Sequence, residues 1–144
     1  PRKRLLRRCP RHERAHEPQC AGLSASNIRY LLVIRELQRE RKIVRSSDVA
    51  QALKVSRPSV HAMLESMKET GLLFKERRGS VSLTPDGQML AEEYTAYYAS
   101  VGACLEGMFP DEEEIGGVVC NILSEISRES LGKFCAREVL PVLG

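Results

Sequence analysis

The chain of 144 residues has no tryptophan, and aromatic residues make up only 5% of it. It contains no apolar run approaching the roughly 18 residues that span a bilayer. No apolar segment of about 7–15 residues follows the basic start of the chain, as it would in a secretory signal. These absences argue against a membrane protein and against a secreted one. We therefore expect a cytoplasmic protein without a membrane partner.

Disulfide frameworks and thiol enzymes are also disfavoured. The five cysteines are odd in number and scattered along the chain, whereas a disulfide framework normally has an even number. No histidine follows His61. A Cys–His pair is therefore not available near Cys104, Cys120 or Cys135 unless the chain folds back. We do not expect an enzyme.

Negative charge is scarce in the first half of the chain and positive charge in the second. Residues 1–23 hold seven Lys and Arg against two Asp and Glu, residues 24–78 hold twelve against six, and residues 79–144 hold three against eleven. The net charge is only +3. This asymmetry suggests that the first half faces a polyanion, with nucleic acid as the natural candidate. A merely solvated basic face is the alternative.

Residues 1–23 are rich in Arg, Pro and His and have no apolar period, so we interpret them as a basic flexible arm. The arm holds four zinc-type donors in one short stretch, in a spacing that is not that of a common zinc finger. A coincidental grouping in a disordered arm is the alternative. The candidate ligands are Cys9, His12, His16 and Cys20.

Apolar periodicity predicts two helices before residue 54. The first begins after an N-cap at Ser26 and ends near Arg41. The second is short and follows Ser47 and Asp48, whose side chains can accept hydrogen bonds from the free N–H groups of a helix start. The buried faces of the two helices are expected to hold Tyr30, Val33, Ile34 and Leu37, and then Val49, Ala50 and Leu53.

The third predicted helix is the most regular one. Ser56 is its expected N-cap, and Pro58 stands in its first turn, where the missing N–H costs nothing. Gly71 supplies a C-terminal cap. Small polar residues at the start of this helix allow it to approach another surface closely. Its buried face is expected to hold Val60, Met63, Leu64 and Met67.

The segments LLFKERR and SVSLT flank Gly79 and are typical of a hairpin. Helix, short helix, helix and hairpin form a winged helix-turn-helix, whose recognition helix enters the DNA major groove while the wing lies on the phosphates. An arginine on that helix can pair with guanine, and hydroxyl groups and basic residues of the wing tip can hold phosphates. The candidate DNA-binding residues are Ser47, Ser56, Arg57, Pro58, Ser59 and His61, with Lys75, Arg77 and Arg78 at the wing tip.

Three more helices are predicted after the hairpin. Thr84 caps a long helix to about Gly107, an acidic run from residue 111 to 114 suits the start of the next, and a last one runs from about Arg128 to Leu140. Helices that follow a single DNA-binding domain commonly pair two copies of a chain. The expected apolar faces hold Leu90, Tyr94, Tyr97, Tyr98, Val101, Leu105 and Met108, and then Ile115, Val118, Val119, Ile122, Leu123 and Ile126.

The sequence therefore predicts a mostly α-helical protein in three parts. A basic arm at residues 1–23 precedes a winged helix-turn-helix DNA-binding domain at 24–83, and a linking helix with a helical dimerisation domain follows at 84–144. The expected function is that of a homodimeric regulator of transcription that binds double-stranded DNA.

Four segments of the chain carry a resemblance to a known family. They are YLLVIRELQRE, SSDVAQALKVSRPSVHAMLESMKETGLL, GSVSLTPDGQMLAEE and PDEEEIGGVVCNILSEIS. Over about residues 26–138 the chain resembles the metal-dependent transcriptional repressors of the diphtheria-toxin-repressor and manganese-transport-regulator type. The resemblance implies a dimeric repressor that binds its operators when loaded with iron(II) or manganese(II).

The expected metal ligands of that family are largely replaced in this chain. Iron(II) and manganese(II) prefer oxygen and imidazole donors, and an arginine at such a site would repel a cation. Only Cys120 matches a ligand type that some members use, so the cofactor stays unknown and Cys120 is the one candidate ligand among these positions. The positions that correspond to the family's ligands are Arg29, Leu32, Tyr98, Cys120, Leu123 and Ser124.

Two alternatives remain within the non-enzymatic class. One is a winged-helix regulator similar to the multiple-antibiotic-resistance type, which would sense a small molecule or, through a thiol such as Cys104 or Cys120, a redox state. The other is a winged-helix adaptor that binds protein and not DNA. The basic residues on the wing and recognition helix argue against the adaptor.

Overall fold

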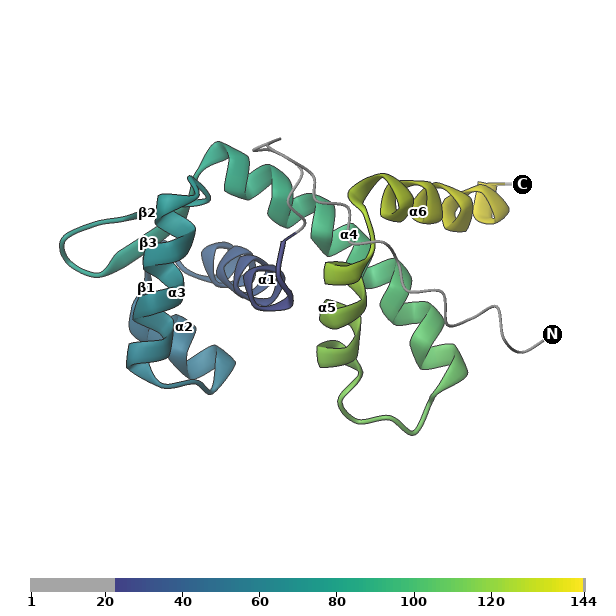
Figure 1. Ribbon diagram of the computed structural model, residues 1–144, viewed down its shortest axis with the longest axis horizontal. Helices are drawn as coiled ribbons and strands as arrows, with labels where there is room; N and C mark the ends of the chain where they lie inside the picture. The colour runs from purple at the N-terminus through teal and green to yellow at the C-terminus, as the bar shows by residue number, and fades with distance from the viewer. Residues whose placement is uncertain (1–22, 144) are drawn as a thin grey trace, which may run out of the picture.

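The computed structural model describes residues 23–143 and shows a mostly helical chain with one small sheet, as expected (Figure 1). The candidate zinc ligands of the arm lie outside these residues. Within residues 23–143, no helix combines the length and the apolar character needed to cross a membrane. In chain order the elements are α1 (Ala25–Glu40), β1 (Val44–Arg45), α2 (Ser46–Leu53), α3 (Arg57–Glu69), β2 (Leu73–Lys75), β3 (Ser80–Leu83), α4 (Pro85–Met108), α5 (Ile115–Glu125) and α6 (Arg128–Leu143).

The starts of α1, α2 and α3 are each fixed by a hydrogen bond between residues close in the sequence. The predicted cap of α3 is confirmed, because Ser59 N donates to Ser56 Oγ at 3.3 Å. The predicted cap of α1 at Ser26 is wrong by two residues: Ser24 has the extended backbone of a cap, and its Oγ accepts from Asn27 N at 3.1 Å. In α2, Asp48 accepts from the backbone N–H of Arg45 at 2.8 Å. Its carboxylate satisfies a free donor and sits favourably at the positive end of the helix.

The sheet is antiparallel and has the strand order β1-β3-β2. The predicted hairpin is β2 and β3, which pair Leu73 with Leu83. The first strand, β1, was not predicted, since it has only two residues. It pairs Val44 with Val81 and is followed by a bond from Ser46 N to Gly79 O at 3.1 Å, which ties the wing to the start of α2.

Two apolar cores lie side by side along the chain, and α1 contributes to both. The first core joins α1, α2, α3 and the sheet, with Leu31 and Ile34 of α1 fully buried in it. The second core joins α1 with α4, α5 and α6 and includes Ile28. The helix α1 is therefore shared between the two halves of the structure.

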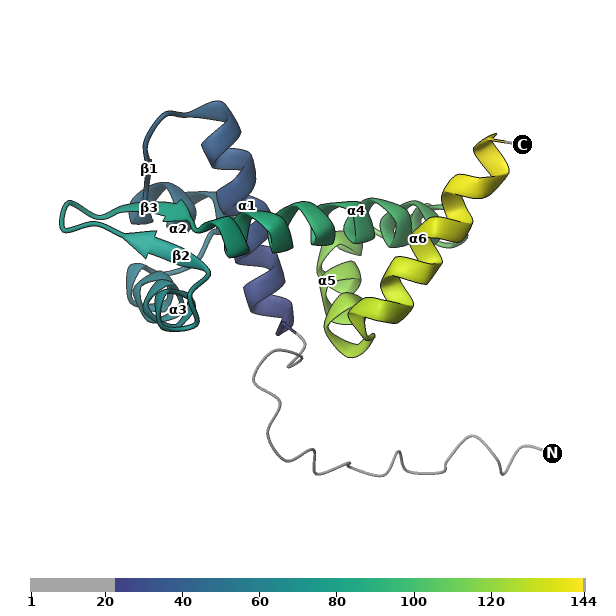
Figure 2. The ribbon, with the colours of Figure 1, turned by 90° about the horizontal axis from the view of Figure 1, so that it is seen from above.

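The long helix α4 extends from the wing to the region of α5 and α6 (Figure 2). Its predicted cap is confirmed, because Gly87 N donates to Thr84 Oγ1 at 3.0 Å. Its predicted apolar face is buried through Tyr94, Tyr97 and Val101, but Met108 at its end is 63% exposed. This agrees with the length of the face, which is more than a small monomer is expected to cover alone.

Glu93 of α4 links this helix to the start of α6 through hydrogen bonds. Glu93 accepts a hydrogen bond from Tyr97 Oη at 2.6 Å and another from Arg128 Nε at 3.0 Å. The Arg128 hydrogen bond lowers the pKa of Glu93, and burial together with the bond to Glu93 raises that of Tyr97. This cluster holds the carboxylate ionised and the phenol protonated, so both hydrogen bonds persist at neutral pH.

Candidate functional site

The N-terminus of α3 presents a short, exposed and polar surface. Ser56, Arg57, Pro58, Ser59 and His61 are all exposed, and Ser56 Oγ lies 2.8 Å from Ser59 Oγ. Among the described residues, Arg57 forms no hydrogen bond or ion pair through its side chain. The free backbone N–H groups of this helix start and its dipole favour an anion. The guanidinium group is available for a partner outside the chain.

The turn between β2 and β3 carries two further arginines. Gly79 N donates to Glu76 O at 3.0 Å, which closes a tight turn around Arg77 and Arg78, and both arginine residues are exposed. Gly79 has a φ of +75°, in the left-handed region that favours glycine. The geometry of this turn thus projects two positive charges at the wing tip.

The third predicted wing residue, Lys75, is placed differently from the expectation. Its side chain is only 13% exposed, and its Nζ lies 2.6 Å from Glu65 Oε1 and 2.9 Å from His61 Nδ1, both on α3. The hydrogen bond from Lys75 lowers the pKa of Glu65. Lys75 therefore joins the wing to α3, and its assignment to the wing tip was wrong because the position lies in β2, where the side chain reaches the neighbouring helix.

Two basic residues near this surface were missed. Arg45 and Lys54 are exposed at the two ends of α2, and Ser47, which was predicted, is exposed in the first turn of that helix. Lys54 has a φ of +54° and forms the C-cap that turns the chain toward α3. Their positive charge was visible in the sequence, but their position beside the helix starts follows only from the fold.

A second feature is an open cleft of about 830 Å³ between α1, α2, α4 and α5. It brings together Arg29, Leu32, Tyr98 and Cys120, four of the positions at which the resemblance placed metal ligands. The other two do not line it: Leu123 is fully buried, and Ser124 Oγ donates to Asn121 O at 2.6 Å. The cleft thus lies where the resemblance placed the metal site, but its side chains differ from the family's metal ligands.

The residues of this cleft do not fit iron(II) or manganese(II). Cys120 is 3% exposed, and its burial raises the pKa of the thiol, which Arg29 only partly opposes. Burial also raises the pKa of Tyr98, so a metal ion would have to displace a proton from each of these two groups in order to bind. Among the side chains of residues 23–137, no three His, Cys, Asp or Glu gather as a metal site would need. The guanidinium of Arg29 adds repulsion.

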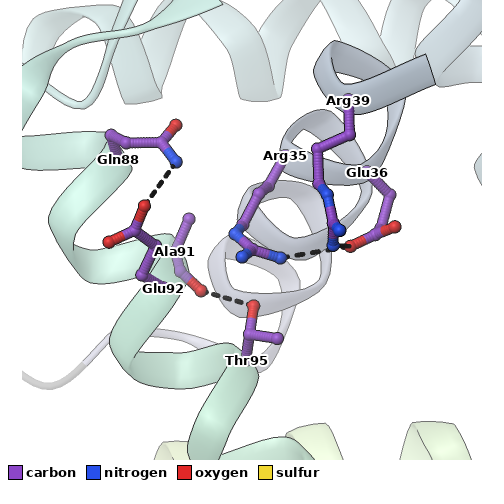
Figure 3. A network of polar contacts seen from close by, with 7 residues as sticks. All are labelled: Arg35, Glu36, Arg39, Gln88, Ala91, Glu92 and Thr95. Atoms are coloured by element: carbon purple, nitrogen blue, oxygen red, sulfur yellow. Dashed lines mark hydrogen bonds and ion pairs between the residues drawn. The ribbon is translucent and has the colours of Figure 1, made fainter.

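The carboxylate of Glu36 on the cleft wall is compensated by neighbouring arginines of α1 (Figure 3). Its Oε1 lies 3.2 Å from Arg35 Nη1 and 3.4 Å from Arg39 Nη1. Figure 3 also shows Thr95 of α4, another cleft residue, whose hydroxyl donates to Ala91 O at 2.6 Å and is thereby occupied within its own helix. These two polar residues are therefore not free to bind a ligand strongly.

Comparison with known proteins supports the resemblance in the first half of the chain. Residues 22–81 match the family model described as iron dependent repressor, N-terminal DNA binding domain. This range includes α1, α2, α3 and β2. No curated protein sequence matches the chain.

Two solved structures share the fold. The crystal structure of T. acidophilum IdeR aligns over 76% of this chain with a TM-score of 0.60 and 22% identity, and the alignment covers 52% of that protein, so this chain spans about half its length. The hypothetical protein SSo2273 from Sulfolobus solfataricus aligns over 78% of this chain and 86% of its own, with a TM-score of 0.56 and 21% identity. The predicted winged-helix fold is confirmed by these likenesses.

Proposed function

We propose that the protein is a homodimeric repressor of transcription. The proposal starts from the match of residues 22–81 to the DNA-binding domain of the iron-dependent repressor family. A DNA-binding regulator of transcription is what the matched domain and the fold support, and a cytoplasmic place of action goes with that role. The dimer, the repressing role and the residues that bind DNA are our proposals. So is the division into a basic arm at 1–23, a winged helix at 24–83 and a dimerisation domain at 84–144.

The observation that carries DNA binding is the exposed start of α3, with Arg57 unpaired among the described residues. In a winged helix this helix start faces the major groove. Arg57 can then bond a guanine, while Ser59 and Ser56 hold phosphate oxygens at the positive end of the helix. Arg77 and Arg78 at the wing tip add phosphate contacts that hold the domain in register without selecting bases.

A homodimer is supported by an apolar face at α5 that the described residues leave uncovered. Val118 is 42% exposed, and half-buried Ile122 follows it at the i+4 spacing of one helix face. Ile126, the C-cap residue directly after α5, is 40% exposed. Met108 and Phe109, at the end of α4, are 63% and 57% exposed. A second copy of the chain would cover these side chains and bring two recognition helices to the halves of a palindromic site.

The control of repression is not assigned to iron or manganese, because the donor groups of the cleft do not fit either metal. We derive no step that requires one. In this proposal the protein recognises its operator through α3 and the wing. The unpaired basic residues at this surface favour DNA binding over the alternative of an adaptor that does not bind DNA.

Selection from a pool of random duplexes tests DNA binding, in buffer with a chelator and separately with manganese(II) or iron(II). We expect one palindromic site to be enriched in all conditions. Arg57→Ala should then weaken binding to that site by about 1–3 kcal/mol and relax one position of it, whereas Arg78→Ala should weaken all duplexes alike. Arg39→Ala, on α1 and 65% exposed at its side chain, is the control. The absence of enrichment in every condition would favour the adaptor.

Light scattering tests the dimer. The parent chain should have twice the 16.1 kDa mass of one copy, and the pair Val118→Glu and Ile126→Glu should reduce it to that of one copy, because two like charges would be buried across the interface. Ile43→Glu, at a loop residue that is 62% exposed, serves as the control and should remain dimeric. A parent that is already a monomer would refute the dimer without affecting the DNA-binding proposal.

A further inference from the structure

We propose that the cleft between α1, α2, α4 and α5 is a binding site for an apolar organic carboxylate. The carboxylate group would be bound by Arg29 and Tyr98, and the hydrocarbon part would lie along the apolar face of α1. A volume of about 830 Å³ is within the range of small-molecule sites.

The polar end of the cleft is built from hydrogen-bond donors. Two consecutive glycines open the first turn of α5: a Cβ at Gly116 would lie 2.7 Å from Tyr98 Oη, and a Cβ at Gly117 would lie 3.4 Å from Arg29 Nη2. The glycines thereby make room for the tips of both side chains above the same helix start. Arg29 forms no ion pair with any side chain of residues 23–137. A guanidinium and a phenol hydroxyl at one end of a cleft match a carboxylate.

An apolar strip lines the cleft along α1 and α2. Leu32, Val33 and Leu37 line it from α1, and Leu53 closes it from α2. All except Leu37 are only partly buried by the protein itself, so a hydrocarbon chain would remove further apolar surface from water. The ligand would therefore carry its charge at one end and be apolar over several carbon atoms.

The carboxylates around the cleft do not turn it into a cation site. Glu36 is already compensated by Arg35 and Arg39. Glu40, Glu113 and Glu114 are exposed residues, so solvent and salt screen their charge. Beside Arg29, the buried Cys120 is held in its neutral form, because burial raises the pKa of the thiol. The deep end of the cleft thus offers positive charge and donors.

The position of the cleft would allow such a ligand to act as an effector of DNA binding. It is lined by α2 from the winged-helix half and by α5 from the half proposed to dimerise, so one bound molecule would contact both. This effector role rests on the proposed function, but the binding site itself does not. The test of binding uses no DNA, so either proposal can fail without the other.

Isothermal titration calorimetry of the full chain with three probes of equal chain length tests the site. The probes are octanoate, octanol and octyltrimethylammonium. We expect octanoate to bind at one site per chain and at least about tenfold more tightly than octanol, because a hydrogen-bonded charge contributes that much. Tighter binding of the ammonium probe, equal binding of octanoate and octanol, or no binding of octanoate would overturn the proposal.

Three variants locate the binding. Arg29→Gln should lower the affinity for octanoate at least about tenfold and leave that for octanol unchanged. Gly116→Ala should lower it severalfold, because the added methyl group displaces the Tyr98 hydroxyl. Arg137→Gln, at an exposed position of α6 that does not line the cleft, makes the same chemical change elsewhere and should bind like the parent. Circular dichroism checks that each variant is folded. Octanoate binding that survives in both folded cleft variants would place the ligand elsewhere and refute the site.

Discussion

Replacing Gly87 by alanine should destabilise the protein strongly, although alanine is normally the better helix residue. Gly87 is buried in the first turn of α4. A Cβ there would overlap the carbonyl oxygen of Leu72 and would lie 2.9 Å from its carbonyl carbon. These are backbone atoms of the residue directly before β2, so the overlap is not relieved by turning a side chain. The start of α4 would have to move away from the sheet.

The magnitude follows from what that movement breaks. Overpacking of this kind costs roughly 1–3 kcal/mol. The displaced chain would also strain the bond from Thr84 N to Leu72 O at 3.1 Å and that from Thr84 Oγ1 to Gly71 O at 2.6 Å, each worth roughly 0.5–1.5 kcal/mol. The higher helix propensity of alanine returns about 1 kcal/mol. We expect a net loss of about 2–4 kcal/mol in the free energy of unfolding.

Urea denaturation followed by circular dichroism measures this loss, and Gly107→Ala is the matched control. Gly107 lies in the same helix, is exposed, and a Cβ there would meet nothing within 4 Å. Gly107→Ala should therefore stabilise the protein by up to about 1 kcal/mol. If Gly87→Ala were as stable as the parent, the close packing of α4 on the backbone directly before β2 would be refuted.

Further expectations concern the core, acid stability and thiols. Leu64→Ala should lower the free energy of unfolding, measured by thermal denaturation, by about 2–5 kcal/mol because Leu64 is fully buried. Phe74→Ala, at a residue 57% exposed, should lower it little. Equal losses would contradict the burial of Leu64 in the first core. The Arg128 hydrogen bond lowers the pKa of Glu93 in the folded protein from the ordinary 4.5. The contribution of ionised Glu93 to the stability of the fold is therefore complete above about pH 4.5, and it is lost as the pH falls through the lowered pKa of the folded state. Glu93→Gln should then flatten the acid decline of unfolding free energy, and an unchanged decline would count against the link between α4 and α6. Burial raises the pKa of Cys120, so alkylation mapped by mass spectrometry should reach half-buried Cys104 and Cys135 before Cys120; the reverse order would disprove the burial.

Local signals allowed the winged-helix half to be predicted from the sequence. Ser56 and Pro58 set the start of α3, Gly71 its end, and Gly79 the hairpin turn, because each acts on the backbone within a few residues. The strand β1 was beyond such signals, since two residues carry no periodicity and pair only through a distant partner, Val81.

The site was predicted less completely, for a related reason. Arg57, Arg77 and Arg78 are exposed where the pattern of a winged helix puts them, and their roles remain predictions. Lys75 shows the limit: its charge was evident, but its pairing with Glu65 depends on how β2 packs on α3. The cleft gathers side chains from four helices and an acidic loop, so no local stretch of sequence contained its shape.

The sharing of α1 between two cores affects how this protein can be divided or recombined. Ile28 is fully covered by the second core, while Leu31 and Ile34, within two turns of it, are fully covered by the first. A fragment ending after Leu83 would leave Ile28 facing water, and a chimera carrying this winged helix on a foreign dimerisation unit would inherit the same bare side chain. The transplantable unit is therefore the winged helix with the first turns of α1 redesigned, and an unmodified graft should aggregate or unfold at a lower temperature.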